Sequence, residues 1–318
     1  MKKLLVFTLL VLFISTANAQ YRWDVGLALG GSNYLGEMGG KEKTRQDFVL
    51  DLKLNQTRWV IGGFGRYRVS RLLSVNGGIN YLRLQGADRH SSNPERVGRY
   101  LNFRNDMFEF YVRPEITFFQ DNDLGGRGRY KTDFRLFGYV GAAVYLSNPK
   151  GQINGEGDWH SLRPLRTEGQ DSEYSNIGFA LPVGLGFYFT KNRKYRFGFD
   201  IGWRTTFDDY IDDVSTTYAN PADLPSQLSI DLQNQHEYAP STVNGEPVPD
   251  QYQYGYWDSG GDSPVSNNKR GDPTHNDSYL TMNFTFSYVL KGQSNFYKKR
   301  YSWIKGKRRI GRKSRAKF

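Results

Sequence analysis

The chain has 318 residues, of which 38% are hydrophobic and 15% aromatic, and its formal net charge is +11. It contains no cysteine, which excludes lipoprotein acylation, disulfide bonds, thiolate metal sites and a cysteine nucleophile. No later stretch approaches the roughly 18 consecutive apolar residues of a membrane-spanning helix, so helical membrane proteins are excluded too.

The first residues predict export from the cytoplasm. They read MKKLLVFTLLVLFISTANAQ, with two lysines, a short apolar run and an Ala17-Asn18-Ala19 ending. This is the pattern of a secretory signal, and we expect residues 1–19 to be removed by cleavage after Ala19.

Alternation of apolar and polar residues predicts eight β-strands in the rest of the chain. Glycine falls on both faces of four of these runs, so the alternation does not distinguish their inward from their outward positions. Each run has about ten or more residues, which is longer than the usual five or six of soluble sheets and long enough to cross a bilayer. In chain order, the runs are 23–34, 58–69, 72–84, 108–118, 133–146, 177–189, 195–204 and 279–288.

The connections between these runs alternate between long and short. Turns at Ser70-Arg71 and in TKNRK, and the short link QDNDLGGRGRYK, separate connections of about twenty, twenty, thirty and seventy residues. An even strand count with this alternation is typical of outer-membrane β-barrels, whose short turns face the periplasm. The predicted fold is therefore all-β: an eight-stranded antiparallel transmembrane barrel over residues 20–290, with both ends of the chain in the periplasm.

A secreted β-sandwich is the alternative, because its strands alternate in the same way. Charged and glycine residues on one face, and aromatic residues near strand ends, favour the barrel. An eight-stranded barrel is only wide enough for side chains to fill. We expect a paired polar network in its interior, not a wide pore, made by Arg113, Glu115, Arg196, Asp200 and Arg204.

Aspartates are concentrated just after the seventh run, in IGWRTTFDDYIDDVSTTYAN. Asp208, Asp209, Asp212 and Asp213 raise the possibility of a calcium loop or of a glycosidase carboxylate pair. The spacing lacks the ligand pattern and central glycine of a calcium-binding hand, and no apolar pocket is evident to raise one carboxyl pKa. We expect a solvated base of the longest loop, where these carboxylates pair with arginine or cap backbone groups.

Other catalytic patterns are lacking. His90, His160, His236 and His275 are isolated in predicted loops, and no serine lies in a G-x-S-x-G elbow. The glycines of LALGGSNYLGEMGG precede no Lys-Ser/Thr pair or helix, which disfavours a phosphate loop. We predict a protein that is not an enzyme, with no catalytic, cofactor-binding or metal-binding residues and no small-molecule substrate.

The positive charge is concentrated at the C-terminus. Residues 291–318 hold twelve Lys or Arg and no Asp or Glu, so residues 20–290 carry a net −3. This basic tail is either a solvated segment or a periplasmic docking segment that orders on a partner; nucleic acid is not expected as a partner of an exported barrel. The candidate docking residues are Lys298, Lys299, Arg300, Tyr301, Trp303, Lys305, Lys307, Arg308, Arg309, Arg312, Lys313 and Arg315.

Four segments together resemble the PorG-type outer-membrane proteins of the type IX secretion system of Bacteroidetes. They are VGLALGGSNYLGEMGG, RPLRTEGQ, ALPVGLGFYF and, most specifically, IGWRTTFDDYIDDVSTTY, which contains Asp208, Asp209, Tyr210, Asp212 and Asp213. The resemblance implies a small barrel, in outer-membrane lipid, that is an accessory or anchoring component beside a periplasmic ring of lipoprotein and partner subunits. It also implies a system that exports cargo and in some organisms supports gliding motility.

Two functions follow as hypotheses. The first is a non-enzymatic barrel that anchors a periplasmic ring assembly of a type IX-like machine, with the basic tail as the candidate contact. The second is a surface-binding protein whose long loops capture a ligand, a glycan or a neighbouring cell.

Overall fold

The computed structural model describes residues 22–36, 38, 54–122, 124, 132–248 and 270–290. The predicted signal, residues 1–19, and the basic tail, residues 291–318, lie outside these ranges. Within them, no helix is both long enough and apolar enough to cross a membrane.

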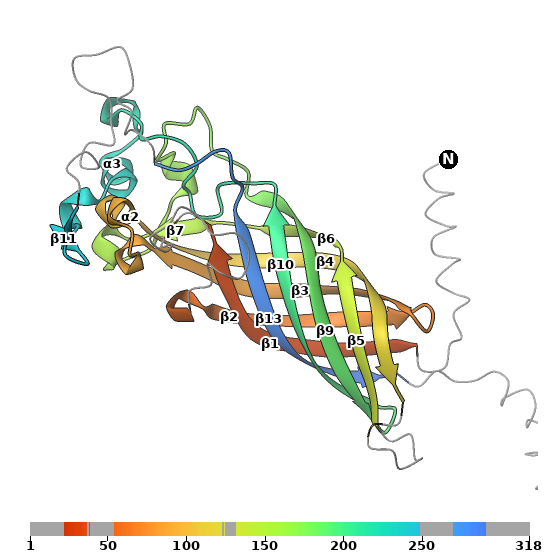
Figure 1. Cartoon of the computed structure of the whole chain (residues 1–318). Coiled ribbons are helices and arrows are strands. Elements are labelled where there is room, and N and C mark those ends of the chain that lie inside the picture. Colours follow the sequence, from red (N-terminus) through yellow and green to blue (C-terminus); the bar gives the residue numbers. More distant parts are fainter. Residues whose placement is uncertain are drawn as a thin grey trace, which may run out of the picture.

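Antiparallel strands form a closed ring (Figure 1). The order around the ring is β3-β2-β1-β13-β10-β9-β5-β4, and β3 pairs with β4 from Leu73↔Ile116 to Ala87↔Asn102, which closes it. β5 and β6 share one position, because both pair with β4 and β9. The strands are β1 (Trp23–Leu35), β2 (Arg58–Arg68), β3 (Leu73–Ala87), β4 (Asn102–Asp121), β5 (Thr132–Val140), β6 (Ala142–Leu146), β9 (Ile177–Lys191), β10 (Tyr195–Thr206) and β13 (Ser278–Val289).

The eight predicted strands are confirmed, with differences of a few residues in extent, of which two affect the architecture. β4 has 20 residues and starts six residues before the predicted run. The run 133–146 is interrupted at Gly141, between β5 and β6. A Cβ atom at Gly141 would lie 2.4 Å from the carbonyl oxygen of Val112 on β4, so the chain approaches its neighbour too closely there for any side chain.

The two ends of the barrel differ. At one end, here called the turn end, β1 begins beside the end of β13, since Asp24 is opposite Val289. Tight turns join β2 to β3 and β9 to β10 at the same end, the second with Asn192 and Arg193 at φ of 53° and 56°. The four long connections leave from the opposite end, here called the loop end.

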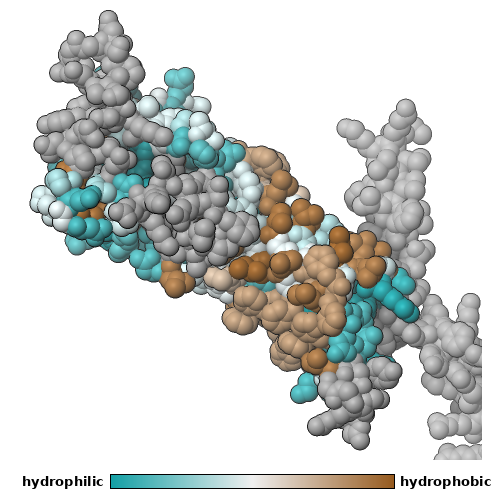
Figure 2. Space-filling view, in the orientation of Figure 1, coloured by the Kyte–Doolittle hydropathy of each residue, from teal (hydrophilic) through white to brown (hydrophobic). Residues whose placement is uncertain are grey.

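The outer face of the wall is apolar and bounded by aromatic residues. Figure 2 shows hydrophobic surface over the wall, with hydrophilic surface toward both ends. The rings of Trp23 and Tyr67 are 4.8 Å apart at the turn end, and those of Trp59 and Tyr81 are 5.0 Å apart at the loop end. Along β2, Trp59 and Tyr67 are separated by about 26 Å at ~3.3 Å per residue. Because strands of membrane barrels tilt by about 35–45° from the membrane normal, this separation corresponds to a height of roughly 20 Å, somewhat less than the typical apolar band of about 25 Å.

The described residues of the long connections form a folded layer above the barrel, here called the cap: residues 88–101, 147–176, 207–248 and 270–277. β4 extends into it, and Leu101, Phe103, Leu162, Ile211 and Leu232 are buried in its core. Its elements are short: α2 (Pro94–Arg99), α3 (Gln227–Gln233), β7 (Pro149–Gly151), β8 (His160–Ser161), β11 (Thr242–Val243) and β12 (Glu246–Pro247). Single 3-10 turns cover Asp88–His90, Ile153–Gly155, Arg163–Leu165, Pro221–Asp223 and His236–Tyr238, and another, Leu54–Gln56, precedes β2.

Candidate functional site: the barrel interior and the cap

Charged side chains fill the interior of the barrel. On β4 and β10 every second residue is buried, so Arg113, Asp200 and Arg204 point inward while the residues between them face outward. Arg113 and Asp200 are only 3% and 2% exposed. Charges buried this deeply need partners, because burying an unpaired ion costs on the order of several kcal/mol in lost hydration.

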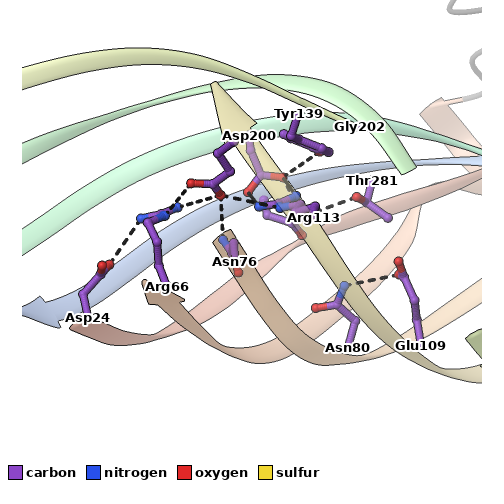
Figure 3. A network of polar contacts seen from close by, with 12 residues as sticks. Asp24, Arg66, Asn76, Asn80, Glu109, Arg113, Tyr139, Asp200, Gly202 and Thr281 are labelled. Carbon is purple, nitrogen blue, oxygen red and sulfur yellow. Dashed lines mark hydrogen bonds and ion pairs between the residues drawn. The ribbon is translucent and has the colours of Figure 1, made fainter. Parts of the chain in front are cut away.

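An ion pair crosses the bore between β4 and β10. Arg113 Nη2 lies 3.3 Å from Asp200 Oδ2, and the Tyr139 hydroxyl donates to Asp200 Oδ1 at 3.3 Å (Figure 3). The guanidinium carbon of Arg113 also lies 3.9 Å from the centre of the Tyr139 ring. Since β10 lies three positions from β4 around the ring, this contact spans the interior rather than following the wall.

A second set of contacts lies nearer the turn end. Arg66 contacts Glu115 at 2.6 Å and Asp24 at 3.2 Å, and Asn76 Nδ2 donates to Glu115 Oε1 at 2.7 Å (Figure 3). Arg196 forms an ion pair with the other oxygen of Asp24. Asp24 therefore joins an arginine of β2 to an arginine of β10.

A third set lies nearer the loop end. Arg204 Nε is 3.3 Å from Glu109 Oε1, and Asn80 Nδ2 donates to Glu109 Oε2 at 3.2 Å. Arg204 also donates to the carbonyl oxygen of Gly202 at 2.8 Å and to the hydroxyl of Thr281. The three sets contain four arginines and four carboxylates, so the interior charges balance.

The structure places all five predicted interior residues in this network. The prediction omitted Asp24, Arg66 and Glu109. Glu109 shares a face with Arg113 in the alternation of its run, which is the signal that identifies it. Asp24 and Arg66 belong to runs in which glycine on both faces obscures the phase.

The expectation that the aspartates after β10 are solvated is wrong for most of them. Asp212 and Asp213 are fully buried and Asp209 is 8% exposed, whereas Asp208 and Tyr210 are half-buried. The segment folds into the buried part of the cap, where its own backbone supplies donors. Tyr210 N–H donates to Asp208 Oδ1 at 3.1 Å, and Val214 N–H donates to Asp212 Oδ1 at 2.9 Å.

Asp212 joins the cap to the barrel wall. The hydroxyl of Tyr34, at the end of β1, donates to Asp212 Oδ2 at 2.6 Å and also contacts Asp277 Oδ1. The second oxygen of Asp277 accepts from Ile211 N–H at 3.0 Å. One buried tyrosine thus holds both ends of the longest connection against β1.

Asp213 and Arg270 form the centre of the cap. Asp213 accepts hydrogen bonds from the hydroxyls of Tyr174 at 2.7 Å and Thr167 at 2.5 Å, and lies 3.3 Å from Arg270 Nη2. Arg270 Nη1 also contacts Glu168 Oε1 at 2.9 Å, so one guanidinium serves two carboxylates. Burial raises the pKa of Asp213 to about 6, although Arg270 and the two hydroxyls oppose that shift.

A second buried arginine ties another connection to this centre. Arg99 of α2 binds Asp88 through two hydrogen bonds of 2.7 and 3.0 Å, and its Nη1 donates to the carbonyl oxygen of Arg270 at 2.5 Å. His236 Nδ1 lies 2.6 Å from the carbonyl oxygen of Gly98. Three connections are therefore linked by buried charged and polar contacts into one unit.

The remaining candidate groups are dispersed. His90 lies in a 3-10 turn, His160 in β8 and His275 beside Asp272. Within the described ranges, no group of three or more His, Cys, Asp or Glu side chains is arranged to hold a metal ion. The predicted docking residues of the tail, Lys298 to Arg315, lie outside those ranges.

Comparison with solved structures gives a weak likeness to Ail, the attachment invasion locus protein of Yersinia pestis. Its crystal structure in complex with the heparin analogue sucrose octasulfate is 9% identical, with a TM-score of 0.31; the match covers 84% of this chain and 98% of that one. A second crystal structure of Ail matches over the same shares, at 8% identity and a TM-score of 0.31. Among curated proteins, none matches.

A family model gives the assignment. Residues 5–220, about two thirds of the chain, match the outer membrane protein beta-barrel domain. The closed eight-position ring, the apolar outer face and the polar interior agree with that match. The chain therefore belongs to the outer membrane protein beta-barrel domain family and is a β-barrel of the outer membrane.

Proposed function

We propose that this barrel is a non-enzymatic, non-conducting anchor of a protein assembly, serving as an accessory component of a type IX-like secretion machine. The observation that carries the proposal is the filled interior: the Arg113–Asp200 pair and the Arg204–Glu109 pair both join β4 to β10 across the bore. A bore crossed by paired side chains is suited to holding the wall together rather than to passing solute.

The assignment to a secretion machine is supported by the four sequence segments that resemble PorG-type proteins. The most specific segment, residues 201–218, is also the one whose Asp212 and Asp213 organise the cap. Because the short turns of such barrels face the periplasm, we expect the chain after β13 to continue on the periplasmic side. We infer that the basic tail docks the periplasmic ring subunits there, by charge and by its aromatic residues Tyr301 and Trp303.

Crosslinking in whole cells tests the docking role. A photoreactive residue at Trp303 is expected to capture a periplasmic ring subunit, and deletion of residues 292–318 should leave the barrel in the outer membrane but abolish recovery of that subunit. A matched variant, Tyr301→Ser with Trp303→Ser, keeps the tail's charge and separates aromatic contact from electrostatic attraction. Full recovery of ring subunits after the deletion would overturn docking by the tail.

A second function, surface binding at the loop end, is favoured by one observation. The described cap is a packed unit, with buried residues continuous with those of the barrel and with interlocking arginine pairs, rather than a set of separate loops. Binding proteins place recognition residues on loops that a rigid scaffold positions. This candidate predicts that the recognised ligand, a glycan or a neighbouring cell, contacts the cap.

One set of strains, with either the loop or the tail altered, distinguishes the two proposed functions. Shortening residues 250–269 leaves Val248, Arg270 and the Arg270 contacts in place. If that change abolishes adhesion or glycan binding while tail deletion does not, surface binding is favoured over anchoring. If only the tail deletion has an effect, and that effect is on secretion, the anchoring role stands.

A further inference from the structure

The outward face of β3 and β4 changes abruptly from apolar to charged near the loop end. On β4, the exposed Phe110 and Phe108 are followed on the same face by Asp106 and Arg104. On β3, the step from Tyr81 to Arg83 marks the same boundary, because Tyr81 is opposite Phe108 and Arg83 is opposite Asp106. The boundary therefore runs level across the two strands.

An aromatic ladder lies on the apolar side of this boundary. The ring centres of Trp59 and Tyr81 are 5.0 Å apart, and those of Tyr81 and Phe108 are 4.6 Å apart. Aromatic residues collect where the hydrocarbon of a bilayer meets its headgroups. The ladder thus places the charged residues above it at headgroup level.

The charges above the ladder are mostly positive. They form a set, here called the basic collar: Arg58, Arg83, Arg104 and Lys150. Arg104 is directly opposite Lys150 on β7, so these two cations share a face. Arg58 donates to Gln85 at 2.6 Å, next to Arg83 on the outward face of β3.

One carboxylate serves two of these cations. Asp106 contacts Arg83 at 2.6 Å and Arg104 at 3.5 Å. Arg83 is also near enough to Arg58 for their charges to repel. With Asp106 counted, the basic collar has a net charge of +3. Such a set of cations attracts an anion.

Two of the guanidinium groups are held in place by indole rings. The guanidinium carbon of Arg83 lies 5.5 Å from the centre of the Trp59 ring, and that of Arg104 lies 4.4 Å from the centre of the Trp159 ring. Stacking restrains these side chains before a ligand arrives. Asp106 already accepts hydrogen bonds from Nε and Nη2 of Arg83, at 2.6 and 3.2 Å. The remaining N–H groups of the planar Arg83 guanidinium, on Nη1 and Nη2, are therefore the ones that would contact phosphate oxygens.

We propose that the basic collar is a binding site for the phosphate headgroup of an anionic membrane lipid, whose acyl chains lie along the Trp59–Tyr81–Phe108 ladder. A lipid is favoured over a free anion because the cations adjoin the apolar lipid-facing wall, so a single molecule contacts both surfaces. This site does not depend on the proposed anchoring function.

Native mass spectrometry of the full-length protein in neutral detergent tests the proposal. Phosphatidic acid and phosphatidylcholine with the same acyl chains are added at equal concentration, and inorganic phosphate is added in a separate arm. We expect phosphatidic acid to be retained preferentially. The double variant Arg83→Gln, Arg104→Gln should lower its retention about tenfold, because charge-assisted contacts to phosphate are lost.

Two further double variants serve as controls, one for the shape of the guanidinium groups and one for general positive charge. Arg83→Lys with Arg104→Lys retains both charges but loses the fork and should retain an intermediate amount of lipid. Arg89→Gln with Arg166→Gln removes two cations from the cap and should leave retention unchanged. Equal retention of both lipids, or unchanged retention in the Gln variant, would overturn the site. Inorganic phosphate that displaces the lipid at millimolar concentration would show a free-anion site instead.

Discussion

At the scale of single residues, Asp213 is the main titratable group through which pH acts on the described part of the cap, and burial raises the pKa of Asp208 in the same direction. The folded-state pKa of Asp213, about 6, lies above the ordinary aspartate value, so the folded cap binds a proton more tightly than the unfolded chain does. The resulting stabilisation is complete below about pH 4. This stabilisation is lost as pH rises through about 6. A pKa difference of about two units between the folded and unfolded states corresponds to roughly 3 kcal/mol.

We therefore predict that the free energy of unfolding of the cap falls between pH 4 and 6.5, and that Asp213→Asn flattens this slope. Urea unfolding followed by tryptophan fluorescence measures it in detergent micelles. Asp171→Asn, at an exposed cap position, should retain the slope. A slope that survives Asp213→Asn would assign the titration to another group.

The ion pair between Arg113 and Asp200 gives a second prediction at this scale. Arg113→Met leaves Asp200 buried without its main countercharge, which should cost about 3–5 kcal/mol. The double variant with Asp200→Asn should recover part of that loss. As a control, Arg163→Met breaks the exposed pair with Glu173 and should cost about 1 kcal/mol or less. Equal losses for the buried and the exposed pair would contradict the cross-bore contact.

At the scale of strands, the interruption at Gly141 tests how closely β4 and its neighbours pack. A Cβ there would meet the Val112 carbonyl oxygen at 2.4 Å and Arg113 Cβ at 2.7 Å, whereas a Cβ at Gly65 meets nothing within 4 Å. Gly141→Ala should destabilise the barrel by about 1–3 kcal/mol, and Gly65→Ala should be near neutral. Heat-dependent migration of the folded barrel on gels, or urea unfolding, compares them.

Strand alternation predicted the ring well, and its failures have a physical cause. The runs at β4, β9, β10 and β13 carry large side chains on alternate positions, so their inward residues could be identified. β2 has Gly62, Gly63 and Gly65 on both faces, which obscured the inward position of Arg66.

The burial of Asp213 could not be predicted from the sequence, for a different reason. Its partner Arg270 is 57 residues away in the chain, and Glu168 and Tyr174 belong to another connection. Period-two alternation reports on strands and contains no information about which loops pack together. The folded cap as a whole was therefore not predicted.

At the scale of the molecule, the filled interior predicts that the barrel does not conduct ions. Purified protein in a planar lipid bilayer should add no conductance above that of the lipid alone, because arginine–carboxylate pairs cross the bore. A porin reconstituted in parallel shows that the bilayer reports open channels. A steady conductance from this protein would contradict both the interior network and the proposed non-conducting role.

The length of β4 has a mechanical consequence for the whole molecule. The same 20-residue strand lines the barrel wall and continues into the cap, paired with β3 along fifteen positions from Leu73↔Ile116 to Ala87↔Asn102. A partner that pulls on the cap along the strand axis loads this ladder in shear, so many backbone hydrogen bonds share the force at once. Tension applied to the cap would thus pass along β4 into the barrel wall instead of separating the strands one hydrogen bond at a time.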